Sequence, residues 1–231
     1  METNATLFDF EQRSSESSYV DAIWRTHTHS EGTFMSVAEA HWGLVITNYQ
    51  GKVTAHVRGP ETKATPAPVP EDAEIFGIVF KLGTFMAHLP AMTLVDNPVV
   101  LPDASSDNTF WLNGSAWEMP EFENADTFIN RLVRQGLIAH EPVVEAALQG
   151  QITDLSSRSV QRRFLRATGL THGTVYQIER ARHAMTLLSG GSSILDTVDL
   201  AGYADQSHLT RALKHFIGQT PSQIISIINR E

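Results

Sequence analysis

Short runs in which apolar and polar residues alternate fill the first half of the chain, the pattern of strands that bury one face. The runs richest in β-branched and aromatic residues lie at 33–38, 42–49 and 52–58, and weaker extended runs follow at 98–102 and 109–112. Gln50 and Gly51 join two of these runs and favour a hairpin. A proline-rich loop then leads to the apolar stretch EIFGIVFKLG. Short strands with turns at this spacing predict a small β-barrel or sandwich.

Further along, apolar residues recur every third or fourth position, the period of a helix with one buried face. In the segment ENADTFINRLVRQG this period brings Phe128, Leu132 and Val133 together. The segment EPVVEAALQG follows, with proline where a helix can start and glycine where it can end. We therefore predict an α+β chain, with a β-rich domain at residues 1–118 and an all-α domain at residues 119–231.

The helices expected in the last third of the chain have local start and stop signals. Ser156 or Ser157 can cap a helix that Gly169 ends. An apolar stripe in THGTVYQIERARHAMTLLSGG then predicts a long connecting helix. Ser193 can cap a short helix that Gly202 ends.

One more short helix is expected in QSHLTRALKHFIG, whose apolar residues keep the helical spacing. The sequence TPSQ is a capping box that opens a last helix. The order is therefore helix pair, connecting helix, helix pair and closing helix. Two short helices joined by a tight turn form a helix-turn-helix unit, and this chain has two of them.

Charge separates the two halves of the chain. The formal net charge of the 231 residues is -9. Residues 1–150 hold 8 Lys and Arg against 20 Asp and Glu, a balance of -12, whereas residues 151–231 hold 9 against 6, a balance of +3. A basic module on an acidic partner suits a protein whose smaller part binds DNA.

The second helix of each pair carries polar and cationic side chains suited to the major groove. Arg can read guanine, Gln can read adenine, and Lys or Ser can contact phosphate. These side chains are Arg158, Gln161 and Arg162 in the first unit and Ser207, His208, Arg211 and Lys214 in the second.

Residues 155–224 resemble the DNA-binding domain of the AraC family of bacterial transcription regulators. The matching segments are RSVQRRFLRATGL, ERARHAMTLLSGG and ILDTVDLAGYADQSHLTRALKHFIGQTPSQI. The resemblance implies a DNA-binding core at residues 155–228 with two helix-turn-helix units that enter successive major grooves, about 34 Å apart. One feature departs from the family pattern, because GQITDLS makes the turn of the first unit longer than usual.

Carried over one by one, the family's base-facing positions fall on Arg158, Gln161, Arg162, Ser207, His208 and Arg211. Arg166 and Lys214 are better placed for phosphate. The alternative for the cations is a solvated helix face, and His208 could instead cap its own helix. Arg180 and Arg182, on the connecting helix, are expected to form salt bridges within the module.

The N-terminal half resembles the β-barrel domains, often cupin-like, that precede this module in many family members. Its aromatic residues could line an apolar effector pocket, or they could be plain core. The candidates are Trp24, Phe34, Trp42, Phe76, Phe80 and Trp111.

A metal site is the rival interpretation of the N-terminal half. His27, His29 and His41 are its candidate ligands, because imidazole and carboxylate groups hold divalent ions. Glu31 lies too close to the histidine pair for the cupin spacing, so surface histidines are the simpler interpretation. We expect no metal and no other cofactor. The absence of cysteine excludes disulfides, iron–sulfur clusters and thiolate zinc sites.

The leading hypothesis is a sequence-specific transcription regulator that binds promoter DNA, and the resemblance favours an activator, with RNA polymerase as a partner. Its N-terminal domain would sense a small molecule, form a homodimer, or do both. The rivals are a metal-binding cupin protein or enzyme with a helical appendage, and a dimerisation module without effector. No nucleophile elbow, phosphate loop or paired-acid motif occurs, so we expect no enzyme. Without a long apolar window or a basic, hydrophobic start, we expect a cytoplasmic protein that avoids membranes.

Overall fold

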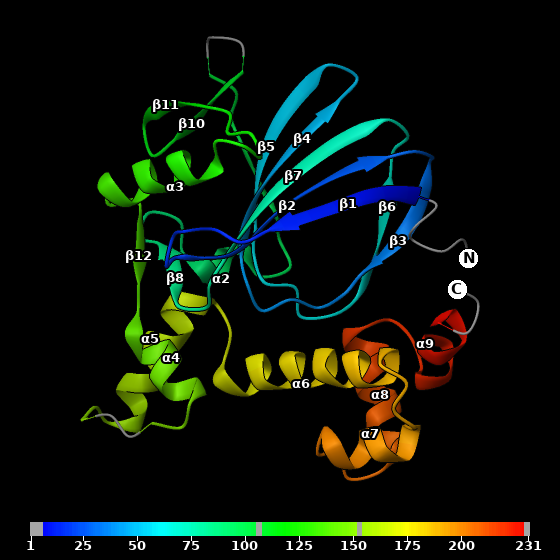
Figure 1. Ribbon diagram of the computed structural model, residues 1–231. Coiled ribbons are helices and arrows are strands. Elements are labelled where there is room, and N and C mark those ends of the chain that lie inside the picture. The colour runs from blue at the N-terminus through cyan, green and yellow to red at the C-terminus, as the bar shows by residue number, and fades with distance from the viewer. Residues whose placement is uncertain (1–6, 105–107, 152–153, 229–231) are drawn as a thin grey trace.

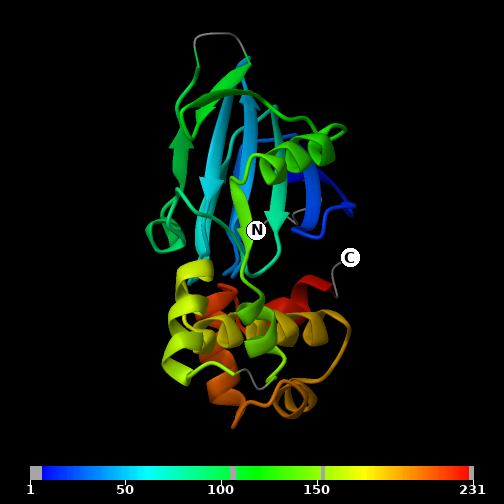
Figure 2. The same cartoon turned by 90° about the vertical axis from the view of Figure 1, so that its left-hand side faces the viewer.

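The structure is a computed structural model that describes residues 7–104, 108–151 and 154–228. It confirms the α+β class, with strands filling the upper part of the molecule and helices the lower part (Figure 1). Figure 2 shows the same two parts after a quarter turn. None of the helices in the described ranges is long and apolar enough to cross a membrane.

The central element of the upper part is an antiparallel sheet of six strands, in the order β1-β2-β7-β4-β5-β9. These strands are β1 (Phe8–Arg13), β2 (Val20–Thr28), β7 (Ala73–Phe80), β4 (Gly43–Tyr49), β5 (Lys52–Arg58) and β9 (Val99–Leu101). The hairpin predicted between β4 and β5 is confirmed, since Tyr49 pairs with Lys52 across the turn. Gln50 and Gly51 both have positive φ there, as a type I′ turn requires.

Three two-stranded ribbons complete the strands of the upper part. They are β3 (Gly32–Ser36) with β6 (Thr65–Val69), β8 (Thr84–Met86) with β12 (Ile138–His140), and β10 (Thr109–Leu112) with β11 (Ser115–Glu118). The proline-rich segment, expected as a loop, contains β6. Pro66 and Pro68 are tolerated there because β6 pairs on one side with β3, and an edge strand does not need every N–H.

The core of this upper part extends beyond the strands of the sheet. Buried residues of the sheet, such as Ile23 and Ile78, belong to one cluster with Phe128 and Leu132 of α3 (Ala125–Arg134) and with Ile138 of β12. A short helix, α2 (Ala91–Leu94), adds Leu94 to the same cluster. We call residues 7–140 the β unit, because their packing groups α3 and β12 with the sheet.

The lower part, residues 142–228, is called the helical module. It contains α4 (Pro142–Leu148), α5 (Ser157–Thr168), α6 (His172–Ser189), α7 (Ile194–Leu200), α8 (Gln206–Phe216) and α9 (Pro221–Ile228). The predicted order of helices is thus confirmed. Ser156 and Ser193 accept the N-cap hydrogen bonds of α5 and α7, and Gly169 ends α5 in a left-handed conformation, as expected.

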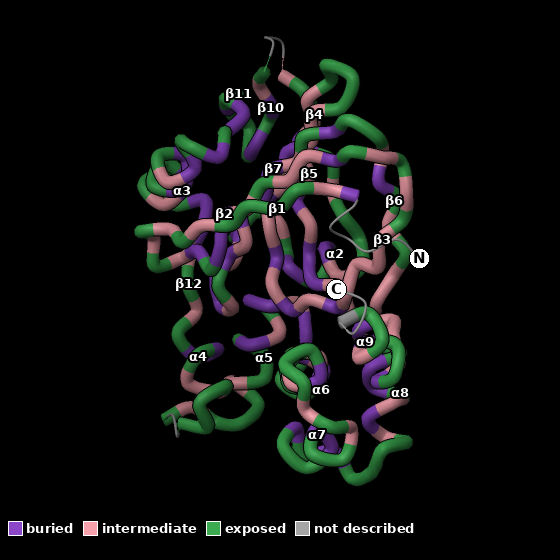
Figure 3. The backbone as a smooth tube through the Cα atoms, turned by 45° about the vertical axis from the view of Figure 1, so that its right-hand side comes forward, coloured by how far each residue is buried: buried purple, intermediate pink, exposed green. Residues whose placement is uncertain are grey.

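Two hydrophobic clusters stabilise the helical module, one toward each end of α6. Phe164 of α5 and Ile178 of α6 belong to the first cluster, and Leu188 of α6 with Leu209 and Leu213 of α8 belong to the second. Figure 3 shows these buried segments around α6 and the exposed outer surfaces of the helices. The connecting helix therefore sets the relative position of the two helix pairs.

Candidate nucleic-acid interface and ligand cavity

The second helix pair is held at its turn by Arg180 of α6. Its guanidinium lies 3.8 Å from the ring centroid of Tyr203, a buried residue of the turn. It also donates hydrogen bonds to the carbonyl oxygens of Ala201, at 2.9 Å, and of Gly202. Arg180 thus binds backbone and an aromatic ring, whereas a salt bridge was expected. This contact fixes α7 and α8 against the connecting helix.

The start of α8 depends on Asp205. Its carboxylate accepts a hydrogen bond of 2.7 Å from the backbone N–H of His208, which satisfies one of the free donors at the helix start. The imidazole of His208 packs edge-on against Tyr203, at 5.1 Å between centroids. The helix is therefore capped by Asp205, and the side chain of His208 is half-buried beside the turn. Ser207, Arg211 and Lys214 are exposed on α8.

The corresponding residues of the first helix pair are also exposed. Arg158, Gln161 and Arg162 lie on α5, and none of them forms an ion pair or a side-chain hydrogen bond within the described ranges. Arg166 is exposed too, but its guanidinium lies 5.4 Å from the ring of Phe85 in β8, so it contacts the β unit. The long turn before α5 includes residues 152–153, which lie outside the described residues.

The two sets of candidate DNA contacts lie toward opposite ends of α6 (Figure 1). Of the four cations in these sets, Arg158, Arg162, Arg211 and Lys214, none has a carboxylate partner among the residues that the structure describes. Unpaired cations can exchange their counterions for phosphate groups. The arrangement is therefore suited to a polyanion.

The structure does not bring the three candidate metal ligands together. His27 lies 3.0 Å from Asp72 and His29 lies 2.9 Å from Asp9, and both imidazoles are more than 40% exposed. His41 instead belongs to another group, with Glu39 and Glu179, whose ligand atoms lie within 4.8 Å of one another. In the described part of the chain this group is the one that could hold a metal ion.

Two of these residues, Glu39 and His41, already have partners, and Glu39 also pairs across the two parts of the molecule. The carboxylate of Glu39 contacts the imidazole of His41 at 2.5 Å and the guanidinium of Arg182 at 2.9 Å. Arg182 also donates to the carbonyl oxygen of Ala38 at 3.2 Å. Because Arg182 lies on α6, this network ties the helical module to the β unit. Its ion pair therefore crosses between the units, whereas one inside the module was expected.

Burial, hydrogen bonds and neighbouring charges together shift the pKa values of this network. Burial alone would lower the pKa of His41, but its hydrogen bond to Glu39 and the negative charges of Glu39 and Glu179 outweigh burial and raise it. Burial would raise the pKa of Glu39, but the hydrogen bond and charge of His41, together with Arg182, lower it. Burial raises the pKa of Glu179, one of whose oxygens is buried without a hydrogen-bond partner.

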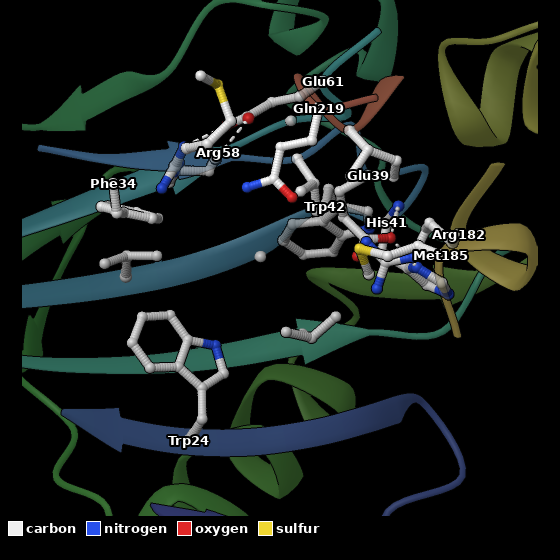
Figure 4. A pocket seen from close by; sticks show the side chains of 18 of the residues that line it. Trp24, Phe34, Glu39, His41, Trp42, Arg58, Glu61, Arg182, Met185 and Gln219 are labelled. Atoms are coloured by element: carbon white, nitrogen blue, oxygen red, sulfur yellow. Dashed lines mark hydrogen bonds and ion pairs between the residues drawn. The ribbon is translucent and has the colours of Figure 1, made fainter. Parts of the chain in front are cut away.

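A cavity of about 670 Å³ opens beside this network (Figure 4). Three of the six predicted pocket residues, Trp24, Phe34 and Trp42, line it. Phe76 lines a separate cavity of about 540 Å³, and neither cavity is lined by Phe80 or Trp111. Phe80 is fully buried and stacks on Trp42 at 4.0 Å, whereas Trp111 is 42% exposed on β10.

Several residues of the larger cavity were not predicted from the sequence. Arg58 and Glu61 come from the end of β5 and the loop after it, and Met185 and Gln219 come from the helical module. Each belongs to a segment that the sequence assigns to a strand, a loop or a helix, and not to a pocket. No local signal identifies them, because only the docking of the two units brings them together.

Comparison with known proteins supports the assignment of the helices. Residues 150–226 match the family model described as a helix-turn-helix domain. The chain is similar to the HTH-type transcriptional regulator RipA of Corynebacterium glutamicum, with 35% identity over 94 residues, and to that of Corynebacterium diphtheriae, with 36% identity over 100 residues. No solved structure matches.

These similarities cover a limited part of each protein. The matched segments make up 40% and 42% of this chain but only 28% and 29% of the two relatives. The family model covers α5 to α8 and most of α9, but it does not include α4, the first helix of the first pair. Residues 150–226 form a helix-turn-helix domain of the AraC type.

Proposed function

We propose that this protein is a DNA-binding transcription regulator that recognises specific promoter sequences. The observation that carries the proposal is the pair of exposed, cationic helices α5 and α8 inside the helix-turn-helix domain. The four candidate cations Arg158, Arg162, Arg211 and Lys214 have no carboxylate partners in the described ranges, and the domain is the segment that resembles known regulators. This function needs no catalysis.

The length of α6 supports recognition of two grooves by one chain. An 18-residue helix is about 27 Å long, because each residue adds about 1.5 Å. Helices packed toward its two ends can therefore meet major grooves about 34 Å apart. We infer that α5 and α8 are the two recognition helices. Arg158, Gln161 and Arg162 would face bases in one groove.

The second groove would be read by Ser207 and Arg211, with His208 at its edge beside Tyr203. Lys214 would contact phosphate, since it lies one turn further along α8. Arg166 is a weaker candidate for phosphate, because its guanidinium also stacks on Phe85.

Selection of duplexes from a random pool by the full chain, followed by gel-shift titration, tests the proposal. Arg211→Ala should weaken binding to the selected duplex by about 1–3 kcal/mol and relax the choice of base at one position. Lys52→Ala is the control, because Lys52 is exposed in the β4–β5 hairpin of the β unit. If random duplex competes as well as the selected one at moderate salt, sequence-specific regulation is refuted.

We also propose that the β unit senses a small molecule, and that the boundary between the units lies near Glu141. The cavity supports sensing, and the packing of α3 and β12 on the sheet supports the boundary.

Dimerisation, activation of transcription through RNA polymerase and a cytoplasmic location remain predictions from the sequence. Sedimentation of the purified chain and a promoter fusion in cells would test the first two.

A further inference from the structure

The larger cavity lies between the β unit and the helical module. The β unit contributes Trp24 and Phe34 to its walls. The helical module contributes Met185 of α6, Gln219 from the turn before α9, and Ile224 of α9. Figure 4 shows side chains of both units around the same space. Its volume of about 670 Å³ falls in the range of small-molecule sites.

The segments that line this cavity also hold the end of α8. The backbone N–H of Ala38 donates to the carbonyl oxygen of Phe216 at 2.7 Å. The backbone N–H of Ala64 donates to the carbonyl oxygen of His215 at 2.9 Å. Val37 next to Ala38 lines the cavity. A molecule in the cavity therefore contacts the segment that fixes the last turn of a DNA-recognition helix.

The charged groups of the cavity are already paired with one another. Arg58 forms an ion pair with Glu61, and Arg182 forms one with Glu39. A charged ligand would have to separate one of these pairs, and the charge left without a partner would be costly in a partly buried site. The remaining lining is largely aromatic and aliphatic. The cavity therefore favours an uncharged ligand.

Three neutral polar groups of the lining stay available for a ligand. The amide of Gln219 and the hydroxyls of Thr33 and Ser189 have no side-chain hydrogen-bond partner within the described residues. The labelled side chain of Gln219 points toward the cavity in Figure 4. Gln219 is half-buried, whereas Thr33 and Ser189 are exposed to solvent, so Gln219 gains most from a ligand that supplies a hydrogen bond.

We propose that this cavity binds an uncharged, mostly apolar small molecule with one hydrogen-bonding group, and that its occupancy changes the DNA affinity of α8. The second half of this proposal rests on the proposed regulatory function. The first half does not, because ligand binding can be measured without DNA. The molecule contacts both units, so it stabilises one arrangement of α8 relative to the β unit.

Two fluorescent probes that share one aromatic skeleton test the class of ligand on the full chain. N-phenyl-1-naphthylamine is neutral and has one N–H, whereas 1-anilinonaphthalene-8-sulfonate adds a negative charge. The neutral probe should bind with a blue-shifted emission, and the sulfonate should bind at least tenfold more weakly. Equal or tighter binding of the sulfonate would overturn the assignment of an uncharged ligand.

Substitutions that fill the cavity from either side test its location. Met185→Trp fills it from the helical module and Val45→Trp fills it from the sheet, so each should weaken binding of the neutral probe at least tenfold. Leu195→Trp is the matched control, because Leu195 is 69% exposed on α7 and does not line the cavity. Circular dichroism verifies that each variant folds. Unchanged probe binding in either folded cavity variant would refute the site.

The coupling to DNA is tested by titrating the selected duplex with and without saturating neutral probe. Occupancy of the cavity should change the affinity for this duplex at least fivefold, in either direction. The same affinity in both titrations would refute the coupling. If the full chain selects no duplex, the proposed regulatory function fails, whereas the probe titrations still decide whether the cavity is a ligand site.

Discussion

Gly218 lies where the end of α8 meets the β unit. It has a φ of +79°, and a Cβ atom there would lie 2.6 Å from Cγ of Met35. Gly202, at the turn before α8, has a similar φ of +69° but nothing within 4 Å of such a Cβ atom. The two glycines thus share the same backbone requirement, and only one of them is also closely packed.

Gly218→Ala should therefore destabilise the protein more than Gly202→Ala. Both substitutions place a side chain in the left-handed region, at a cost of about 1 kcal/mol. Gly218→Ala adds overpacking against Met35, which typically costs about 1–3 kcal/mol. Thermal unfolding of the two variants measures the difference. Equal melting temperatures would contradict the close contact between the units.

His41 should make the stability of the contact between the units depend on pH. The pKa of His41 in the folded protein is raised above the ordinary 6.5. Its contribution to the free energy of unfolding is therefore complete below about pH 6.5 and is lost as the pH rises through the raised value. The raised pKa of Glu179 acts in the same direction. The pKa of Glu39 is lowered from 4.5. Glu39 therefore stabilises the folded protein above pH 4.5, and this stabilisation is lost as the pH falls through the lowered value.

We predict that the melting temperature of the full chain falls between pH 6 and pH 8, and that His41→Gln makes this fall smaller. Gln keeps a polar side chain of similar length but cannot be charged. His29→Gln is the control, because His29 pairs with Asp9 away from this network. An identical fall in the wild-type chain and in His41→Gln would exclude His41 as the titrating group.

At the scale of elements, α8 depends on its N-cap. Asp205→Ala removes the acceptor for the N–H of His208 and should cost about 1 kcal/mol, whereas Asp205→Asn, which also caps, should cost a few tenths. Urea unfolding of the two variants measures this difference. Equal losses would mean that the charge of Asp205, and not its hydrogen bond, stabilises the helix start.

The elements that the sequence predicts well are those with local signals. Ser156, Gly169 and Ser193 mark helix ends because caps depend on neighbouring backbone groups. The β4–β5 hairpin was predictable for the same reason. The exposed side chains of α5 and α8 follow from helical spacing alone, so their positions on the helices could also be predicted.

The elements that the sequence does not predict depend on pairing partners far away in the chain. β12 exists because it pairs with β8, and its three residues have no strand signal of their own. β6 contains Pro66 and Pro68, which normally indicate a loop. The cavity is missed for the same reason, since Arg58 and Gln219 meet only after the units dock. Long-range pairing and docking decide these features, and a local pattern does not contain them.

At the scale of the molecule, the acidic first half and basic second half should make DNA binding depend on salt through the helical module. Each phosphate contact releases about one counterion, so Lys214→Ala should lower the slope of log affinity against log salt by about 1. Lys52→Ala in the β unit should leave the slope unchanged. Gel-shift titrations at several salt concentrations measure it. A slope that Lys214→Ala does not change would remove this residue from the phosphate contacts.

Two backbone hydrogen bonds, from the N–H groups of Ala38 and Ala64, connect the β unit to the end of α8. The last carbonyl groups of a helix have no partner within it, and here the β unit supplies two donors. The amide protons of Ala38 and Ala64 are therefore protected only while the units are docked. Their rates of exchange with solvent deuterium give the free energy of undocking, free or bound to DNA, without any label on the protein.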